Sequence, residues 1–187
     1  MPRKTKVTKA DILETAVQLV RQEGSVALNA RNLAKKLNCS TQPIFSNFNS
    51  MDEVRVEVIR QAEALYDQYI RDDMGSGKYP PYKASGMAYI RFAVEERELF
   101  KLLFMRDRSK EVLPGITPDI EVLMEIIQKN VGISREKAER FHLSMWSHVH
   151  GIATMAATSY LQLDWELISL TLTEVYQGLR LYYIKED

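Results

Sequence analysis

Polar and apolar side chains alternate within a short stretch near residue 45. The polar ones are Thr41, Gln42, Ser46 and Asn47. Glutamine and asparagine can pair bidentately with adenine, and a threonine methyl group can contact the methyl group of thymine. Pro43 is tolerated in the first turn of a helix and can pack on a sugar or a methyl group, while Phe45 can contact the DNA backbone. These six residues are therefore candidates for contact with DNA.

The residues around this stretch predict a helix-turn-helix. One apolar helix face, at positions i, i+3, i+4 and i+7, is expected from Ala30, Leu33, Ala34 and Leu37. Residues 38–40 break that pattern, and Ser40 is expected to cap a second short helix. Ile44 and Phe48 of that second helix would point back toward the first. In such a unit the second helix enters the major groove of DNA, so DNA binding is the leading hypothesis.

Positive charge is concentrated at the same end of the chain. Residues 1–50 hold eight Lys and Arg against three Asp and Glu, a net charge of +5, whereas the remainder holds 17 against 22, a net charge of −5. This asymmetry suits a DNA-facing end and a separate end that does not face DNA. The expected phosphate contacts are Arg3, Lys4, Lys6, Lys35 and Lys36. For Lys35 and Lys36 a solvated helix face is the alternative.

Cap residues, helix breakers and apolar spacing divide the chain into about nine helices and no strands. The expected ranges are about 8–23, 29–37, 40–48, 50–72, 81–95, 96–106, 117–131, 134–161 and 164–183. We therefore predict an all-α fold with two domains. Residues 1–50 would form a three-helix helix-turn-helix DNA-binding domain, and residues 51–187 a helical ligand-binding and dimerisation domain.

The last two predicted helices carry apolar residues on more than one face. Such a helix must bury more than one face. Small residues that permit close helix approach accompany these faces, among them Ala153, Ala157 and Gly178. We expect a homodimer through these two helices, which would place two recognition helices about 34 Å apart on a palindromic operator. One large monomeric core is the alternative.

No set of residues predicts an enzyme. A Ser/His/Asp arrangement, a phosphate-binding glycine loop and paired carboxylates are all missing from the pattern. His142, His148 and His150 would point to different sides of one helix, so they cannot share a metal there. We expect no catalytic residues, no metal and no cofactor. No apolar run approaches the roughly 20 residues of a membrane span, so we also expect no membrane partner and a cytoplasmic location.

The N-terminal part resembles the TetR family of transcriptional regulators over residues 8–58. The matching positions are Leu33-Ala34, Ser40, Ile44-Phe45, Phe48 and Ser50 to Val54. Three positions depart from the family pattern. Asn38 stands where Gly is usual, Phe45 where Tyr is usual and Met51 where a phosphate-binding Lys is usual, so part of the backbone clamp is missing. Asn tolerates a left-handed turn conformation, so we expect the turn to survive.

The C-terminal part resembles the ligand-sensing half of such regulators. Residues 146–151 are similar to the Trp-x-x-x-His-Gly segment of one subgroup. The resemblance implies a repressor that a small apolar or amphipathic effector of unknown identity releases from double-stranded operator DNA. We predict a pocket lined by Phe92, Phe104, Trp146 and His150, although filling of the core is the alternative for each. A DNA-binding architectural or protein-partnered factor without an inducer is the second hypothesis for the whole chain.

Overall fold

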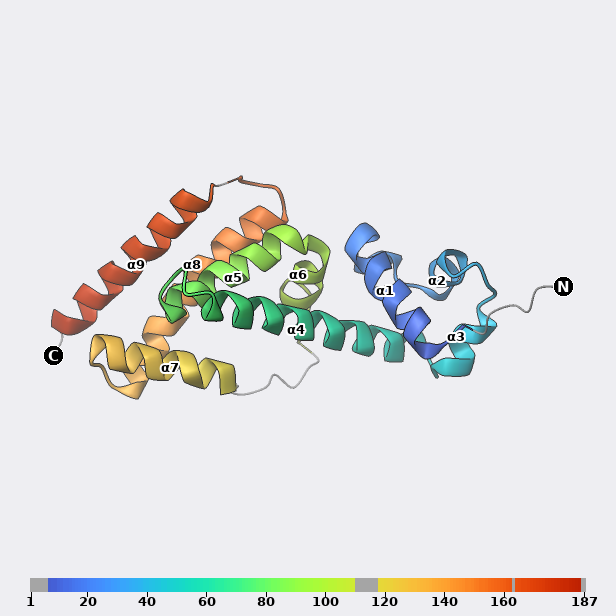
Figure 1. Cartoon of the computed structure of the whole chain (residues 1–187), viewed down its shortest axis with the longest axis horizontal. Helices are drawn as coiled ribbons and strands as arrows, with labels where there is room; N and C mark the ends of the chain where they lie inside the picture. Colours follow the sequence, from blue (N-terminus) through green and yellow to red (C-terminus); the bar gives the residue numbers. More distant parts are fainter. Residues whose placement is uncertain (1–6, 110–117, 163, 186–187) are drawn as a thin grey trace. The chain divides into compact units, whose positions relative to one another are not determined.

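The computed structural model describes residues 7–109, 118–162 and 164–185, and within these ranges every regular element is helical (Figure 1). A 3₁₀ turn, η1 (Ser25–Ala27), accompanies nine α-helices. The helices are α1 (Lys9–Glu23), α2 (Ala30–Lys36), α3 (Gln42–Asn47), α4 (Met51–Gly75), α5 (Pro81–Glu95), α6 (Arg97–Phe104), α7 (Pro118–Val131), α8 (Arg135–Ala157) and α9 (Trp165–Lys185). The all-α prediction of about nine helices is confirmed.

Three helices begin next to the first residue of their predicted ranges, and a side-chain cap opens each of them. The Thr8 hydroxyl accepts a hydrogen bond from the Asp11 amide at 3.2 Å, and the Asp11 carboxylate accepts one from the Thr8 amide at 2.8 Å. The Ser134 hydroxyl opens α8 by accepting from the Lys137 amide, and the Asp164 carboxylate opens α9 in the same way. Each of these side chains satisfies a backbone N–H that the helix itself leaves unpaired.

The prediction that Ser40 caps α3 is wrong. The N-cap residue is Thr41, whose backbone is already helical and whose side chain makes no capping hydrogen bond. An N-cap side chain normally accepts from the second or third amide of its helix. Here the second residue is Pro43, which has no N–H, and the Ile44 amide donates to the Thr41 carbonyl at 3.1 Å. No amide is left for a side-chain cap.

The end of α8 also differs from the prediction. The helix stops at Ala157 rather than near residue 161. Ser159 has a positive φ of 56°, and the Tyr160 amide donates back to the Met155 carbonyl at 2.9 Å. A left-handed residue just past a helix end turns the chain so that following amides pair with the last carbonyls. Residues 158–160 therefore form a turn that ends α8.

The chain divides into two compact units. The first comprises the described residues up to Asp67 together with Glu96–Arg106, and the second comprises Gln68–Glu95 and the described residues from Asp107 onward. α4 therefore contributes its first two thirds to one unit and its last turns to the other. The functional boundary between residues 50 and 51 remains a prediction.

The first unit packs α1, α2, α3, the start of α4 and α6 around a small apolar core. Ile12, Leu33 and Ile44 are fully buried, as is Val58 of α4. Arg21 of α1 holds both carboxylate oxygens of Glu96, which precedes α6. This unit is thus built on the inward faces that apolar spacing predicts for α2 and α3, and it leaves their outward faces to solvent.

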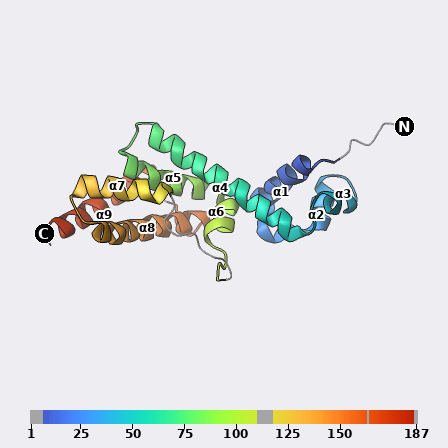
Figure 2. The same ribbon diagram turned by 90° about the horizontal axis from the view of Figure 1, so that it is seen from below.

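The second unit is a bundle in which α5, α8 and α9 lie side by side, with α7 against α8 (Figures 1 and 2). Gly86 of α5 lies where the three helices meet. A β-carbon there would come within 3.2 Å of Leu172 Cδ2 and 3.3 Å of Val149 Cγ2. The absence of a side chain at Gly86 is what lets α5 approach both neighbours so closely.

An aromatic cluster lies near the start of α5 in the same bundle. Phe141 is fully buried, and its ring lies 6.4 Å from that of Tyr82 and 5.3 Å from that of Tyr176. Burial and the neighbouring Tyr176 raise the pKa of the Tyr82 hydroxyl well above its usual value, so it stays protonated. Its oxygen lies 3.0 Å from Nδ1 of His142. Within the described residues no helix is long and apolar enough to cross a membrane.

Candidate nucleic-acid interface

The turn between α2 and α3 sets the direction in which α3 leaves α2. Asn38 has a φ of 50°, in the left-handed region, which confirms that asparagine can take the place usually held by glycine. The Cys39 amide donates to the Ala34 carbonyl at 3.0 Å and the Asn38 amide to the Lys35 carbonyl at 3.2 Å. These bonds close the end of α2 and lead the chain directly into α3.

One face of α3 is exposed and carries three of the predicted contact residues. Gln42, Phe45 and Ser46 follow the i, i+3, i+4 spacing and are all exposed, Phe45 to 51%. The opposite face carries Ile44, which is fully buried, and leads to Phe48, which is 2% exposed. The helix thus has one side committed to the core and one side open to a partner.

The other three predicted contact residues of this helix lie at the edges of the open face. Thr41, Pro43 and Asn47 are each half-buried. The Asn47 side-chain amide donates to the Pro43 carbonyl at 2.8 Å, and the Ser46 hydroxyl donates to the Gln42 carbonyl at 2.9 Å. The remaining oxygen lone pairs of both side chains are acceptors, which suits the exocyclic amino groups of adenine and cytosine in the major groove.

The basic residues of the first unit fall into two groups. Most are paired with a carboxylate, as in Lys36 with Glu23 at 2.9 Å and Arg55 with Asp52 at 2.7 Å. Arg31 and Lys35 are exposed, lie one turn apart on α2, and form no ion pair within the described residues. A cation that forms no ion pair can bind a phosphate without first breaking a contact to a carboxylate. These two residues are therefore the best placed to contact the DNA backbone.

Arg31 is a candidate that the sequence reasoning missed. Its four-residue spacing from Lys35 was visible in the sequence, and both belong to the same face of α2. Lys36 was predicted to contact phosphate, but its amino group is already engaged within the protein. In addition to its ion pair with Glu23, it donates a hydrogen bond to the side-chain oxygen of Gln22 at 3.3 Å. The predicted arm residues Arg3, Lys4 and Lys6 lie outside the described residues.

The helix ends next to α3 are held by charged and aromatic contacts. The amino group of Lys9 lies 4.7 Å from the centre of the Phe48 ring and 3.7 Å from a Glu53 carboxylate oxygen. The Asn49 amide donates to Glu53 at 2.8 Å, which with that lysine lowers the pKa of Glu53. The Ser50 hydroxyl accepts from the Glu53 amide at 3.3 Å. These contacts tie α1 to α4 behind the recognition helix.

The four predicted ligand-pocket residues occupy different surroundings. Phe104 belongs to the first unit, where its ring lies 5.3 Å from Tyr66 and 5.1 Å from Phe100. Phe92 belongs to the second unit and is fully buried, with Tyr69 5.3 Å away edge to face. Their role in binding a ligand remains a prediction.

Trp146 and His150 do lie together. Their rings are stacked at 4.9 Å with an angle of 17°, and Trp146 is 41% exposed. The Tyr89 hydroxyl from α5 lies 2.8 Å from Nδ1 of His150. Partial burial lowers the pKa of His150, which favours the neutral ring at pH 7. An aromatic pair with a polar edge of this kind can hold a flat, partly apolar molecule.

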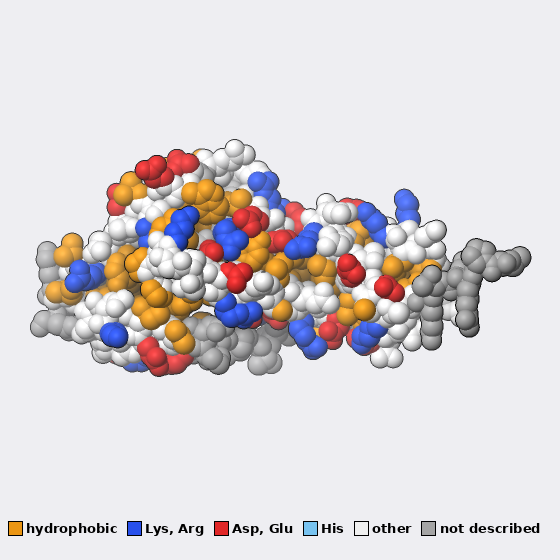
Figure 3. Space-filling view, viewed as in Figure 1, with side chains coloured by type: hydrophobic (Ala, Val, Ile, Leu, Met, Phe, Trp, Pro, Cys, Tyr) orange, Lys and Arg blue, Asp and Glu red, His pale blue; other side chains and the backbone are white. Residues whose placement is uncertain are grey.

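The outer faces of α8 and α9 carry exposed apolar side chains, and hydrophobic surface is visible over this part of the molecule in Figure 3. On α9 they include Leu167, Leu170 and Leu181, each more than 40% exposed. Gly178 lies on the same stripe, with no atom within 4 Å of the position its β-carbon would take. Among the described residues no group of His, Cys, Asp and Glu is arranged to hold a metal.

This chain is similar to known proteins both in sequence and in fold. Residues 82–172 match the family model described as "Tetracyclin repressor-like, C-terminal domain". The fold is similar to the crystal structure of a TetR-like transcriptional regulator from Rhodococcus sp. RHA1, with a TM-score of 0.66, 12% identity and 100% of both chains covered. The chain has the TetR-like fold.

A relative is also similar to this chain in sequence. The chain is 24% identical over 156 residues to the uncharacterized HTH-type transcriptional regulator YobS of Bacillus subtilis (strain 168), covering 81% of this chain and 80% of that protein. The chain is thus similar to an HTH-type transcriptional regulator in sequence and to a TetR-like regulator in fold. The Trp-x-x-x-His-Gly subgroup remains a prediction.

Proposed function

We propose that this TetR-like protein is a transcriptional repressor that binds a palindromic operator as a homodimer and is released by a small apolar or amphipathic ligand. The observation that carries the proposal is the open face of α3, where Gln42, Phe45 and Ser46 are exposed. On α2, Arg31 and Lys35 are exposed too and form no ion pair within the described residues. A helix with one apolar face in the core and one polar face in solvent is what entry into a major groove requires.

The two helices of the motif would have different roles. Gln42 and Ser46 would contact base edges, because they lie on the exposed side of α3 and carry hydrogen-bonding groups. Arg31 and Lys35 on α2 would contact phosphates and fix the register of the protein on the duplex. The predicted arm residues Arg3, Lys4 and Lys6 would add sequence-independent affinity.

Dimerisation would use the exposed stripes of α8 and α9. The α9 stripe contains Leu170, Gly178 and Leu181, so two copies could approach closely at the glycine and bury the leucines on either side. Trp146 and His150 of α8, with Tyr89 of α5, would form one wall of the effector site. A ligand that prefers one arrangement of the helices shifts the population toward it, and this shift would release the DNA.

The test is selection of DNA from a randomised pool, followed by fluorescence-anisotropy titration. The selected duplex, a scrambled duplex and DNA from upstream of the protein's own gene are compared at two salt concentrations. A repressor of this kind should select a palindrome, bind it far more tightly than the scrambled control, and lose affinity as salt rises. Equal and weak binding to all three duplexes would instead favour the architectural or protein-partnered factor.

A further inference from the structure

The outer face of α3 carries no charged side chain. All six residues of the helix, Gln42–Asn47, are described, and none of them is Lys, Arg, Asp or Glu. The commonest base-specific contact in the major groove is an arginine or lysine that donates to O6 and N7 of guanine. The exposed Arg31 and Lys35 belong to α2 instead. Only neutral side chains of α3 can therefore contact base edges, and their free donors and acceptors decide which bases fit.

Gln42 offers both a donor and an acceptor. It is exposed, and its side-chain amide has no hydrogen-bond partner within the described residues. A free primary amide donates through its nitrogen and accepts through its oxygen. Adenine presents the complementary pair, the N6 amino donor beside the N7 acceptor, whereas guanine presents two acceptors at the same edge. Gln42 therefore matches adenine with two hydrogen bonds.

Ser46, one turn further along the same face, has only acceptors left. Its hydroxyl donates its single proton to the Gln42 carbonyl at 2.9 Å, so only the oxygen lone pairs remain. Asn47 at the edge of the face uses one amide hydrogen in the same way, on the Pro43 carbonyl at 2.8 Å. An acceptor attracts the amino groups of adenine and cytosine and repels O6 and N7 of guanine and O4 of thymine. Ser46 therefore favours a base that carries an amino group.

We propose that in each half-site α3 reads an adenine through Gln42 and a base with an amino group, adenine or cytosine, through Ser46, without a guanine contact from this helix. Four residues of an α-helix rise about 6 Å, so the two bases should lie within about two base-pair steps of each other. Base reading by these two residues rests on the proposed function, because it requires α3 to lie in a major groove.

The first test repeats the selection from a randomised pool with the full-length wild type, Gln42→Ala, Ser46→Ala and Gln61→Ala. The wild type should select a palindrome. Gln42→Ala should lose the preference for adenine at one position of each half-site, and Ser46→Ala should lose the preference for adenine or cytosine at a nearby position. Gln61→Ala is the matched control, because Gln61 is an exposed glutamine on α4 in the same unit. It should select the wild-type sequence.

Two kinds of failure are distinguishable in this selection. Guanine at either relaxed position, or the absence of relaxation in either variant, would overturn the base assignment alone, since the wild type would still select a palindrome. A wild type that selects no sequence would defeat the proposed function and the base assignment together. Thermal melts should show that all four proteins are folded, because Gln42 and Ser46 are exposed.

The second test changes single groups of the DNA and leaves the protein intact. In the selected duplex the adenine assigned to Gln42 is replaced with purine, which lacks the N6 amino group, or with 7-deazaadenine, which lacks N7. Each replacement should weaken wild-type binding about fivefold, the lower end of the discrimination that a bidentate pair provides. The affinity of Gln42→Ala should be the same for all three duplexes. Equal losses for the wild type and Gln42→Ala would mean that another residue reads this adenine, and the assignment to Gln42 would be wrong.

A change of preference provides a test that misfolding cannot imitate. Gln42→Arg should come to prefer guanine at the position where the wild type selects adenine, because a guanidinium donates to both O6 and N7 of guanine. Anisotropy titrations of both proteins on the adenine and guanine duplexes measure this exchange. A Gln42→Arg protein that still prefers adenine there would overturn the contact between Gln42 and this base.

Discussion

Phe45 is an exposed apolar residue on the otherwise polar outer face of α3. Its ring is half exposed on a face that otherwise carries hydrogen-bonding groups, while the apolar residues on the other side of α3 are buried. Its burial against sugar or base methyl groups would contribute about 1 kcal/mol. We expect Phe45→Ala to bind the selected duplex roughly fivefold more weakly and to melt at the wild-type temperature. Phe45→Tyr keeps the ring and should bind at least as well. Equal binding by all three proteins in anisotropy titrations would contradict this role.

Arg31 and Lys36 offer a matched comparison on α2. Arg31 has no carboxylate partner within the described residues, whereas Lys36 pairs with Glu23 at 2.9 Å. Each phosphate contact contributes about 0.9 to the slope of log affinity against log salt. Arg31→Gln should therefore lower that slope by about 0.9, and Lys36→Gln should change it much less. Titrations at four salt concentrations measure both slopes. A larger loss for Lys36→Gln would mean that its ion pair opens on DNA and that Arg31 stays in solvent.

At the scale of helices, α5 and α8 are joined by two tyrosine–histidine contacts. The hydroxyls of Tyr82 and Tyr89 lie 3.0 and 2.8 Å from Nδ1 of His142 and His150. Burial lowers the pKa of both histidines below the usual 6.5. The unfolded chain then binds protons more readily than the folded one, so stability is complete above pH 6.5 and falls as the pH drops below it. Urea unfolding at several pH values should show this loss, with a shallower dependence in His142→Gln. A stability that is flat between pH 7 and 5 would exclude the effect.

Gly86 tests how tightly the same bundle is packed. A β-carbon there meets Leu172 at 3.2 Å and Val149 at 3.3 Å, so Gly86→Val must displace α8 or α9. Overpacking of this kind costs about 1–3 kcal/mol. Gly151 lies within α8 with nothing near its β-carbon position, and Gly151→Ala should instead be neutral or stabilising by up to about 1 kcal/mol. Chemical unfolding of both variants measures the difference. A Gly86→Val protein as stable as wild type would show that the helices can separate freely.

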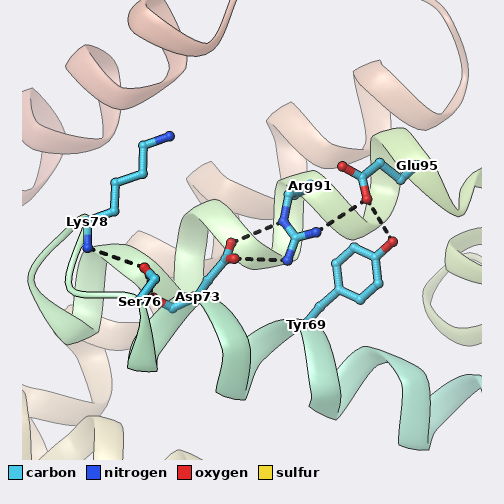
Figure 4. A network of polar contacts seen from close by, with 6 residues as sticks. All are labelled: Tyr69, Asp73, Ser76, Lys78, Arg91 and Glu95. Carbon is cyan, nitrogen blue, oxygen red and sulfur yellow. Dashed lines mark hydrogen bonds and ion pairs between the residues drawn. The ribbon is translucent and has the colours of Figure 1, made fainter.

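Some features of the helices were predictable from the sequence and others were not. The predictable ones depend on residues that are close together in the sequence, whereas the others depend on contacts between residues far apart in it. The starts of α1, α8 and α9 depend on side chains such as Ser134 and Asp164 that bond amides three residues away, so they were predictable. The pairings of Lys36 with Glu23 and of Arg91 with Asp73 (Figure 4) join residues 13 or more positions apart on different helices. The spacing of apolar residues along a single helix does not indicate which charged residues of different helices form a pair. The sequence therefore predicted the open face of α3, but neither the lack of an ion pair at Arg31 within the described residues nor the pairing of Arg91 with Asp73.

At the scale of the whole molecule, the proposed recognition of a palindromic operator requires two copies held at a fixed spacing. We propose that the dimer interface is the exposed stripe of α9. In this stripe Leu170 and Leu181, which are 53% and 58% exposed, lie on either side of Gly178. A stable dimer typically buries about 1,200–2,000 Å², which requires most of this stripe and its counterpart on α8. Light scattering should give twice the chain mass of 21.6 kDa for the wild type.

Charges placed on that stripe should separate the copies, because two carboxylates would be buried against apolar surface. We expect Leu170→Glu with Leu181→Glu to yield a folded monomer whose affinity for the palindrome falls to that for a single half-site. Val122→Glu, at an apolar position on α7 that is 47% exposed, should remain dimeric and bind normally. A variant at Leu170 and Leu181 that stays dimeric would move the interface elsewhere. If Val122→Glu became the monomer instead, α7 would replace α9 as the surface that sets the spacing of the two recognition helices.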